Sequence, residues 1–389
     1  MIEPTDKNGS KNELRTENIE FSNANAKRID QDSDIKKFEA IENLLKTPEA
    51  KDPKFKHDFG AVGGKIDMKK VEAIEMLLFD TDFQDLPDEL TLKVLRNLEP
   101  KDLISCGQAS KILRKISYDN SLWQRVNLSG KKVKSELLEL ILNKESCKSL
   151  NLYGTTILGS LSLVYQKSKL KDLKSKLTDL NLSISGENIQ VSEKILATCC
   201  SLEKLVIERL IITPKMATSI CQNGKSLKVL NIYDSISDQS SYSQIIKSCQ
   251  ELKEVDLALI KKNRTMFEFV AENISPNIEN LNLSKNFLMD NHISMLVSRC
   301  TKITALHLGR TSISDISLTT IRQKLSRTLE EFSLYSIDSF SSDEIIKLNT
   351  MPRLRYLNFQ TKDEEEIKNL TIYLPRLAIN QKSCFTGFK

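Results

Sequence analysis

The sequence predicts an α/β fold, a solenoid with a curved parallel sheet and helices along its outer side. The first observation is an apolar frame, apolar-x-x-apolar-x-apolar, that recurs at intervals close to twenty-five residues. The second is an apolar pattern at helical spacing between the frames. Repeats of roughly 20 to 29 residues with this frame are typical of leucine-rich repeats. The frame centres are Val126, Leu150, Leu180, Leu205, Leu230, Val255, Leu281, Leu306, Phe332 and Leu357, and a shortened copy contains Leu374, Leu377 and Ile379.

Each frame is expected to be a short strand, because side chains alternate between the two faces of a strand. Leu230 and Ile232 then share one inward face, and Asn231 between them points to the concave face of the sheet. Apolar pairs such as Ile195 and Leu196 fall about ten positions before a strand centre and predict a helix packed against the sheet. One unit buries too little surface alone, so the stacked units share a continuous core.

The composition indicates a protein that folds in water. The chain has 389 residues, of which 40% are hydrophobic, and this length permits a large core. A net charge of +5 is too small for its size to indicate nucleic-acid binding. We find no apolar run near the roughly 18 residues of a membrane span and no signal-peptide core at the start, so we do not expect secretion.

The eight cysteines are weighed as structural or metal-binding residues. Cys199, Cys249 and Cys300 each lie six residues before a strand centre, where other repeats carry small residues such as Gly224 or Ser275. A buried position at a helix end fits this pattern better than a metal site, because the chain has no C-x-x-C pair. With three histidines and no motif of a known reaction, we expect no catalytic, cofactor-binding or metal-ligating residues.

The segment before the repeats, residues 86–128, predicts a small helical module. Pro87, Asp88 and Glu89 suit the start of a helix, and Glu99-Pro100 ends it. Two further short helices are expected from the apolar residues that follow. About forty residues with this much apolar surface need a partner or the adjoining solenoid to be stable.

This segment resembles the F-box. The resemblance lies in Leu86-Pro87, the helix leucines and the ending Asp119-Asn120-Ser121-Leu122-Trp123. An F-box that leads directly into leucine-rich repeats resembles the S-phase kinase-associated F-box family, the substrate receptors of SCF ubiquitin ligases. The likeness extends from Leu86 to Phe385.

The resemblance implies that the F-box docks on a Skp-type adaptor, and through it on a cullin and a RING protein. The alternative is that its leucines form the module's own core, and both readings are compatible in a unit this small. Trp123 is assigned to the seam with the first repeat. Carried over by position, the adaptor-binding residues are Leu86, Pro87, Leu90, Val94, Leu95, Leu98 and Leu103.

The concave face is the expected substrate site, because it is the large surface that a solenoid offers to a partner. Tyrosines there suit anchoring contacts. The candidate substrate-binding residues are Glu208, Tyr233, Asp256, His307, Tyr335 and Tyr356.

The resemblance further implies a phosphorylated cyclin-dependent-kinase inhibitor as substrate, a Cks-type accessory protein as a second partner, and a location in nucleus and cytoplasm. Only the ten residues 380–389 follow Ile379, so we expect at most partial cover of the concave face by this tail.

The N-terminal part of the sequence is polar and is expected to be disordered. It contains a duplicated motif at residues 36–45 and 69–78, with eight identities in ten. This motif predicts either two equivalent docking helices or a duplicated segment whose second copy braces the F-box. We expect a disordered tail with one short helical motif (1–65), a helical linker (66–84), an F-box (85–125), leucine-rich repeats (126–380) and a short tail (381–389).

The sequence thus predicts a non-catalytic substrate-recognition subunit of an SCF-type ubiquitin ligase. It would bind a cell-cycle regulator on the concave repeat face and promote its ubiquitination and proteasomal degradation. The competing hypothesis is a leucine-rich-repeat scaffold or inhibitor that binds a protein partner without ubiquitination. Exposure of Leu90 and Leu98 distinguishes the two hypotheses, since a scaffold has no need to expose these leucines.

Overall fold

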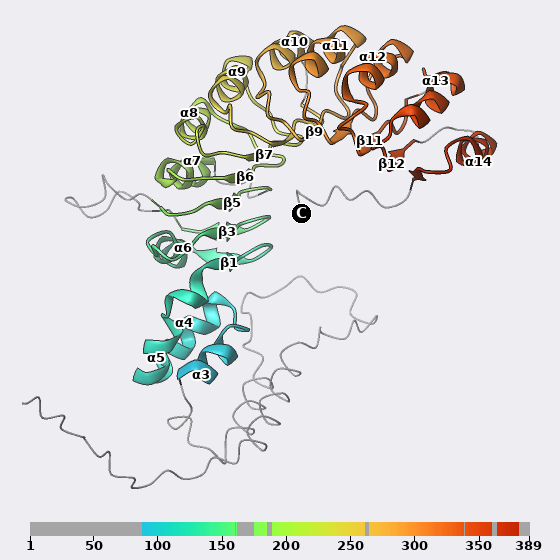
Figure 1. Cartoon of the computed structure of the whole chain (residues 1–389). Helices are drawn as coiled ribbons and strands as arrows, with labels where there is room; N and C mark the ends of the chain where they lie inside the picture. Colours follow the sequence, from blue (N-terminus) through green and yellow to red (C-terminus); the bar gives the residue numbers. More distant parts are fainter. Residues whose placement is uncertain are drawn as a thin grey trace, which may run out of the picture. The chain divides into compact units, whose positions relative to one another are not determined.

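The computed structural model describes residues 88–159, 161, 175–184, 189–260, 264–337, 339–359 and 364–380 (Figure 1). The chain divides into two compact units, Met1–Leu98 and Glu99–Lys389. Several features predicted from the sequence lie outside the described residues: Leu86 and Pro87, the motif at 36–45 and 69–78, and the tail 381–389.

The described part of the first unit consists of the helix α3 (Asp88–Leu95) and the turn that follows it to Leu98. Asp88 and Glu89 occupy its first turn, where negative charge is favourable. The second unit begins with α4 (Pro100–Ala109) and α5 (Lys111–Ser117). Pro100 is at the start of α4, as suits a proline, but it does not end the first helix as predicted, because α3 already ends at Leu95 and a turn follows. The Ser110 hydroxyl caps α5 by accepting a hydrogen bond from the Leu113 amide at 3.0 Å.

The repeats form one eleven-stranded parallel sheet within the described residues, and every predicted frame centre lies in a strand. Val126 pairs with Leu150, Leu150 with Leu180, and this register continues to Phe332 and Leu357. In the shortened last copy the register is shifted by two residues, because Leu357 pairs with Ile379 and Leu377 lies just before the strand. The predicted solenoid is therefore confirmed. The strands are β1 (Arg125–Asn127), β3 (Ser149–Asn151), β5 (Asp179–Asn181), β6 (Lys204–Val206), β7 (Val229–Asn231), β8 (Glu254–Asp256), β9 (Asn280–Asn282), β10 (Ala305–His307), β11 (Glu331–Ser333), β12 (Tyr356–Asn358) and β13 (Ala378–Ile379), and β2 (Lys132–Lys134) pairs with β4 (Thr156–Leu158) in a second, two-stranded sheet.

Each strand of the central repeats ends in the same left-handed turn. The residue four positions after the strand centre has a positive φ, as in Arg209 (56°) and Arg310 (57°). The backbone amide of this residue donates a hydrogen bond to a carbonyl in the next repeat, that of the residue three positions after the strand centre. For example, the Arg209 amide donates to the Tyr233 carbonyl at 3.0 Å. These bonds extend the sheet ladder beyond the strands and fix the edge of the concave face.

The helices of the repeats lie along the outer side of the sheet (Figure 1). Several begin with a side-chain cap, as where Thr213 accepts from the Met216 amide and Asp238 from the Ser241 amide. Every helix among the described residues is too short or too polar to cross a membrane. The helices are α6 (Ser135–Leu142), α7 (Ile189–Thr198), α8 (Pro214–Gln222), α9 (Gln239–Ser248), α10 (Arg264–Asn273), α11 (Asp290–Arg299), α12 (Asp315–Leu325), α13 (Ser342–Ile346) and α14 (Glu364–Tyr373), with short 3-10 turns at η1 (Asn120–Trp123) and η3 (Lys347–Thr350).

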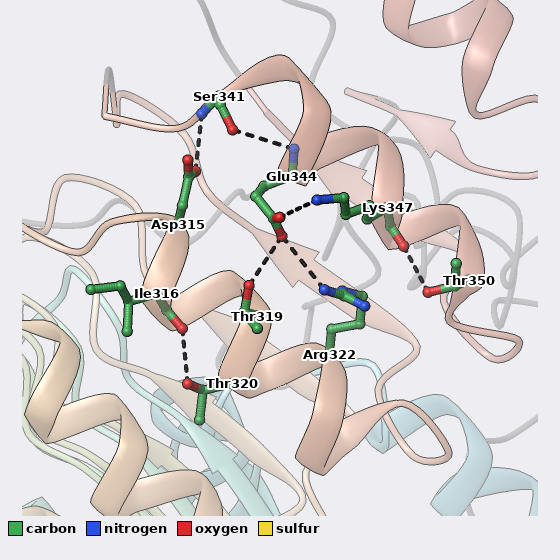
Figure 2. A network of polar contacts seen from close by, with 9 residues as sticks. All are labelled: Asp315, Ile316, Thr319, Thr320, Arg322, Ser341, Glu344, Lys347 and Thr350. Atoms are coloured by element: carbon green, nitrogen blue, oxygen red, sulfur yellow. Dashed lines mark hydrogen bonds and ion pairs between the residues drawn. The ribbon is translucent and has the colours of Figure 1, made fainter.

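Polar side chains connect neighbouring helices on this outer side. Figure 2 shows Glu344 of α13 between Lys347 and two side chains of α12. Its carboxylate contacts Lys347 Nζ at 2.5 Å and Arg322 at 3.6 Å, and it accepts a hydrogen bond from the Thr319 hydroxyl at 3.1 Å. Lys347 is the main reason that the pKa of Glu344 lies below its ordinary value. The contacts hold successive repeats in register where the helices are shortest.

A buried tryptophan joins α5 to the first repeat, as the sequence predicts. Trp123 is 0% exposed, and its indole N–H donates to the Ser117 carbonyl at 2.8 Å. Lys144, just after α6, lies over the rings of Trp123 and Tyr118, with Nζ at 4.9 and 5.2 Å from their centroids. The end of the helical module and the first repeat are thus packed as one body.

Candidate protein-interaction site

The predicted adaptor-binding residues differ in exposure where the structure describes them. Val94, Leu95 and Leu103 are buried, whereas Leu90 and Leu98 are half-buried. The last two are therefore the described members with surface left for a partner. The assignment of all seven residues to the adaptor remains a prediction.

The six predicted substrate-binding residues all lie on or directly after strands of the repeat sheet. Asp256, His307 and Tyr356 belong to strands, and Glu208, Tyr233 and Tyr335 follow strands by two residues. Their exposure is lower than free projection into solvent implies. Asp256 and His307 are only 6% and 8% exposed, and the other four are half-buried. Their role in binding remains a prediction.

A row of asparagine and aspartate side chains on the concave face has a structural task. Each accepts a hydrogen bond from the backbone amide two residues later, as where Asp256 Oδ1 accepts from Ala258 at 2.8 Å. Among the described residues, five asparagines accept the same kind of hydrogen bond at the strand ends. One of them is Asn231, whose Oδ1 accepts from the Tyr233 amide at 2.9 Å. Asp256 is therefore part of the turn that ends β8, in addition to any contact with a partner. The other residues of this kind are Asn127, Asn151, Asn181 and Asn282.

Two carboxyl groups on this face are harder to ionise than usual. Burial raises the pKa of Asp256 to about 6, against hydrogen bonds from Ala258 and Asn282, with nearby Glu208 adding repulsion. Burial also raises the pKa of Glu208, although Asn231 donates to its carboxylate at 2.7 Å. Negative charge here is costly in the chain by itself, so a hydrogen-bond donor or cation from a partner would be favourable.

His307 occupies the concave face at β10. Burial lowers its pKa to about 4, so the ring is neutral near pH 7. Its Nε2 lies 3.7 Å from the Glu331 carboxylate of the next strand. The histidine therefore acts at neutral pH as an uncharged polar group.

Two tyrosines are held by cationic side chains. The Tyr233 ring lies between Arg209 and Lys285, whose charged groups are 6.0 and 5.4 Å from its centroid, and Lys285 Nζ donates to its hydroxyl at 3.2 Å. Tyr335 has Arg310 at 5.9 Å from its centroid. A Cβ atom at Gly309 would come within 2.2 Å of the Tyr335 ring, so this glycine is what lets the ring lie close against the backbone.

The three cations Arg209, Lys285 and Arg310 were missed by the sequence reasoning. All three occur four residues after a strand centre, at Leu205, Leu281 and Leu306. The sequence could have indicated them through their common position four residues after a frame centre, just beyond the strand, where the prediction considered only the strand positions.

The cysteines behave as predicted for buried helix-end residues. Cys199, Cys249 and Cys300 are buried free thiols at the ends of α7, α9 and α11. Burial raises the pKa of Cys199 and Cys249 to about 12, so neither is a thiolate near pH 7. Among the described residues, no group of three histidine, cysteine or acidic side chains is arranged to hold a metal ion.

The fold and these surfaces define a protein-binding repeat protein with a small helical module in front. Comparison with protein families gives the same division. The F-box-like family matches residues 83–129, and the SKP2 LRR domain family matches residues 157–388. Because the second match spans more than half of the chain, the chain belongs to the family with SKP2-type leucine-rich repeats.

Solved structures give more distant likenesses. A chain of the yeast Rad7 and Elc1 complex is similar over 83% of this chain and 99% of its own, with 13% identity and a TM-score of 0.36. The leucine-rich-repeat-containing protein LegL7 from Legionella pneumophila is similar over 64% of this chain and 89% of its own, with 14% identity and a TM-score of 0.35. These likenesses carry no conclusion about function.

The predicted combination of an F-box and leucine-rich repeats is thus confirmed. An F-box implies binding of a Skp-type adaptor, and the repeats imply binding of a protein substrate. Together they support a substrate-receptor role in SCF ubiquitin ligases, in which such proteins are typically non-catalytic subunits.

Proposed function

We propose that this protein recruits a cell-cycle regulator to an SCF-type ubiquitin ligase and so directs that regulator to ubiquitination and proteasomal degradation. The observation that carries the proposal is the order of domains, an F-box directly followed by SKP2-type repeats. The F-box would dock on a Skp-type adaptor connected to a cullin and a RING protein, and the concave face would hold the substrate. Nucleus and cytoplasm are the compartments in which we expect this to occur.

The mechanism is proximity. A receptor that holds a substrate near a charged conjugating enzyme raises the effective concentration of a substrate lysine. The receptor itself needs no bond-making group. A defined join between α5 and the repeats is useful for this task, and the packing of Trp123 between them provides it.

The substrate would contact the concave face near Tyr233 and Tyr335, with Glu208, Asp256, His307 and Tyr356 around them. Half-buried tyrosines held by cations offer rigid, amphipathic contact area. The buried carboxyls of Glu208 and Asp256 suit donors from the substrate. We further propose, from the family resemblance, that a phosphorylated kinase inhibitor is bound together with a Cks-type accessory protein.

Affinity purification from cells tests the proposal. The wild-type chain is compared with a Leu86→Ala, Pro87→Ala double variant, with Ile316→Asp on α12 as control, because Ile316 is 66% exposed and lies in the repeats. We expect the double variant to lose adaptor and cullin and to keep partners bound through the repeats. Recovery of no adaptor by the wild-type chain would instead favour a scaffold that acts without ubiquitination.

A further inference from the structure

Two arginine–tyrosine pairs on the concave edge have the same construction. In each, an arginine follows a strand centre by four residues, and the tyrosine follows the next strand centre by three. Arg209 lies 6.0 Å from the Tyr233 ring centroid, and Arg310 lies 5.9 Å from that of Tyr335. We call these the first and the second Arg–Tyr pair.

Each pair is also joined through the backbone. The Arg209 amide donates to the Tyr233 carbonyl at 3.0 Å, and the Arg310 amide donates to the Tyr335 carbonyl at 2.9 Å. Both arginines have φ values near +56°, set by the turn that ends each strand. The backbone of the two pairs is therefore held in equivalent positions, so little backbone freedom remains to be lost on binding.

The arginines keep surface for a ligand. The Arg209 side chain is 56% exposed and has a long contact of 3.7 Å to Asp234, and Arg310 is exposed. A guanidinium that rests on an aromatic ring keeps its N–H donors at the edge, where they match the two oxygens of a carboxylate. Lys285 lies between the two arginines along this edge, so these turns carry three cations, with Glu208 and Asp234 as the acids beside Arg209.

A third tyrosine shows what distinguishes the pairs. Tyr153 occupies the same repeat position as Tyr233 and Tyr335 and is exposed. The residue that donates to its carbonyl is Gly130, so Tyr153 lacks the arginine. Tyr153 therefore serves as a control position in the same chain, a tyrosine at the same place in the repeat without an arginine beside it.

The spacing of the pairs defines the ligand. Arg209 follows β6 and Arg310 follows β10, four strand steps along the sheet. At about 4.8 Å per step the two sites are roughly 19 Å apart, which an extended peptide spans in about six residues.

We propose that this edge of the concave face binds an extended partner segment with two carboxylates about six residues apart, one on each Arg–Tyr pair. The inference rests on the proposed function, because it specifies the kind of segment that the substrate site accepts. Charge complementarity favours this segment, since Arg209, Lys285 and Arg310 outnumber the acids Glu208 and Asp234 at these turns, and cations already lie over both tyrosine rings.

The test uses fluorescein-labelled Gly/Ser peptides with two glutamates separated by two to ten residues. Their affinity for the full chain is measured by fluorescence anisotropy at low salt. We expect the tightest binding near a separation of six, and about tenfold weaker binding when one glutamate is removed. Arg209→Gln and Arg310→Gln should each abolish the dependence on separation, whereas Tyr153→Ala should leave it unchanged.

Binding that is independent of the separation, or that survives Arg310→Gln with its separation dependence, would overturn the inference. Arg310→Lys is the control for misfolding of the Arg310→Gln variant. It keeps the positive charge, so a folded protein should lose only part of its affinity for the peptide. Adaptor binding by the same preparations is measured separately. If it is intact while the peptides fail, only the peptide inference is lost; if it is absent, the proposed function fails as well.

Discussion

The junction between the helical module and the first repeat gives a prediction with a defined magnitude. Replacing Lys144 by methionine keeps the aliphatic stem and removes the ammonium group that lies over two rings. The ammonium is 4.9 Å from the Trp123 centroid and 5.2 Å from that of Tyr118, and it donates to the Tyr118 carbonyl at 3.3 Å. The two rings are themselves stacked at 6.4 Å.

The expected loss follows from these contacts. A cation over a ring contributes about 0.5–1 kcal/mol at a partly exposed site, and the hydrogen bond about 1 kcal/mol. Burial lowers the pKa of Lys144, which means that the charge carries a desolvation cost that methionine avoids. We therefore expect Lys144→Met to lower the free energy of unfolding at the junction by about 1–2 kcal/mol.

The assay uses the single tryptophan of the chain. Because Trp123 lies in the junction, its fluorescence during urea unfolding reports this part of the repeat stack. Lys148→Met is the control, since Lys148 is an exposed lysine in the same repeat. Equal midpoints for Lys144→Met and Lys148→Met would refute the reasoning.

Three further predictions concern the repeats. His307→Gln should flatten the decline of the free energy of unfolding between pH 6.5 and about 4. The folded-state pKa of His307 is lowered to about 4, so the unfolded chain binds the proton first and the wild type loses stability as the pH falls through this window. Urea midpoints at several pH values measure the effect. Asn223→Leu should cost about 2–4 kcal/mol, because it leaves the Leu202 amide and the Cys199 carbonyl, now bonded to Asn223 at 3.0 and 3.1 Å, without partners; an unchanged thermal midpoint would contradict this. Gly309→Ala should displace the Tyr335 ring and weaken the paired-glutamate peptide without changing adaptor binding, as a crystal structure and the anisotropy assay would show.

The strand positions were predictable because the apolar frame that marks each strand recurs visibly in the sequence at intervals close to twenty-five residues. Each frame centre must be buried, and burial at a fixed interval forces the register in which Val126 pairs with Leu150 and Phe332 with Leu357. The shortened last copy breaks this interval, because Ile379 and not Leu377 pairs with Leu357. The burial of Trp123 and of the helix-end cysteines followed from the same frame.

The details of the concave face were less predictable, because they depend on contacts between repeats. Asp256 was expected to face a partner, but its carboxylate also closes a turn and takes a hydrogen bond from Asn282 at 3.0 Å. Lys285 reaches Tyr233 from two repeats further along, a contact that no local pattern contains. Sequence spacing thus located the surface, and the partners of its side chains required coordinates.

The burial of Leu95 and Leu103 shows a second limit. Apolar spacing on a short helix does not separate residues of the module's own core from those that meet a partner. Leu90 and Leu98, whose exposure was expected to distinguish a receptor from a scaffold, keep the partial exposure that an interface needs.

The most direct test of the central claim is the affinity of the purified chain for a purified Skp-type adaptor, measured by isothermal titration calorimetry. The account predicts a stoichiometric complex that Leu90→Asp weakens by at least tenfold, because a charge would be buried in an apolar interface. The Ile316→Asp control should bind as the wild type does. Absence of binding by the wild-type chain, or equal binding by Leu90→Asp, would contradict the assignment of the F-box as the docking module of an SCF receptor.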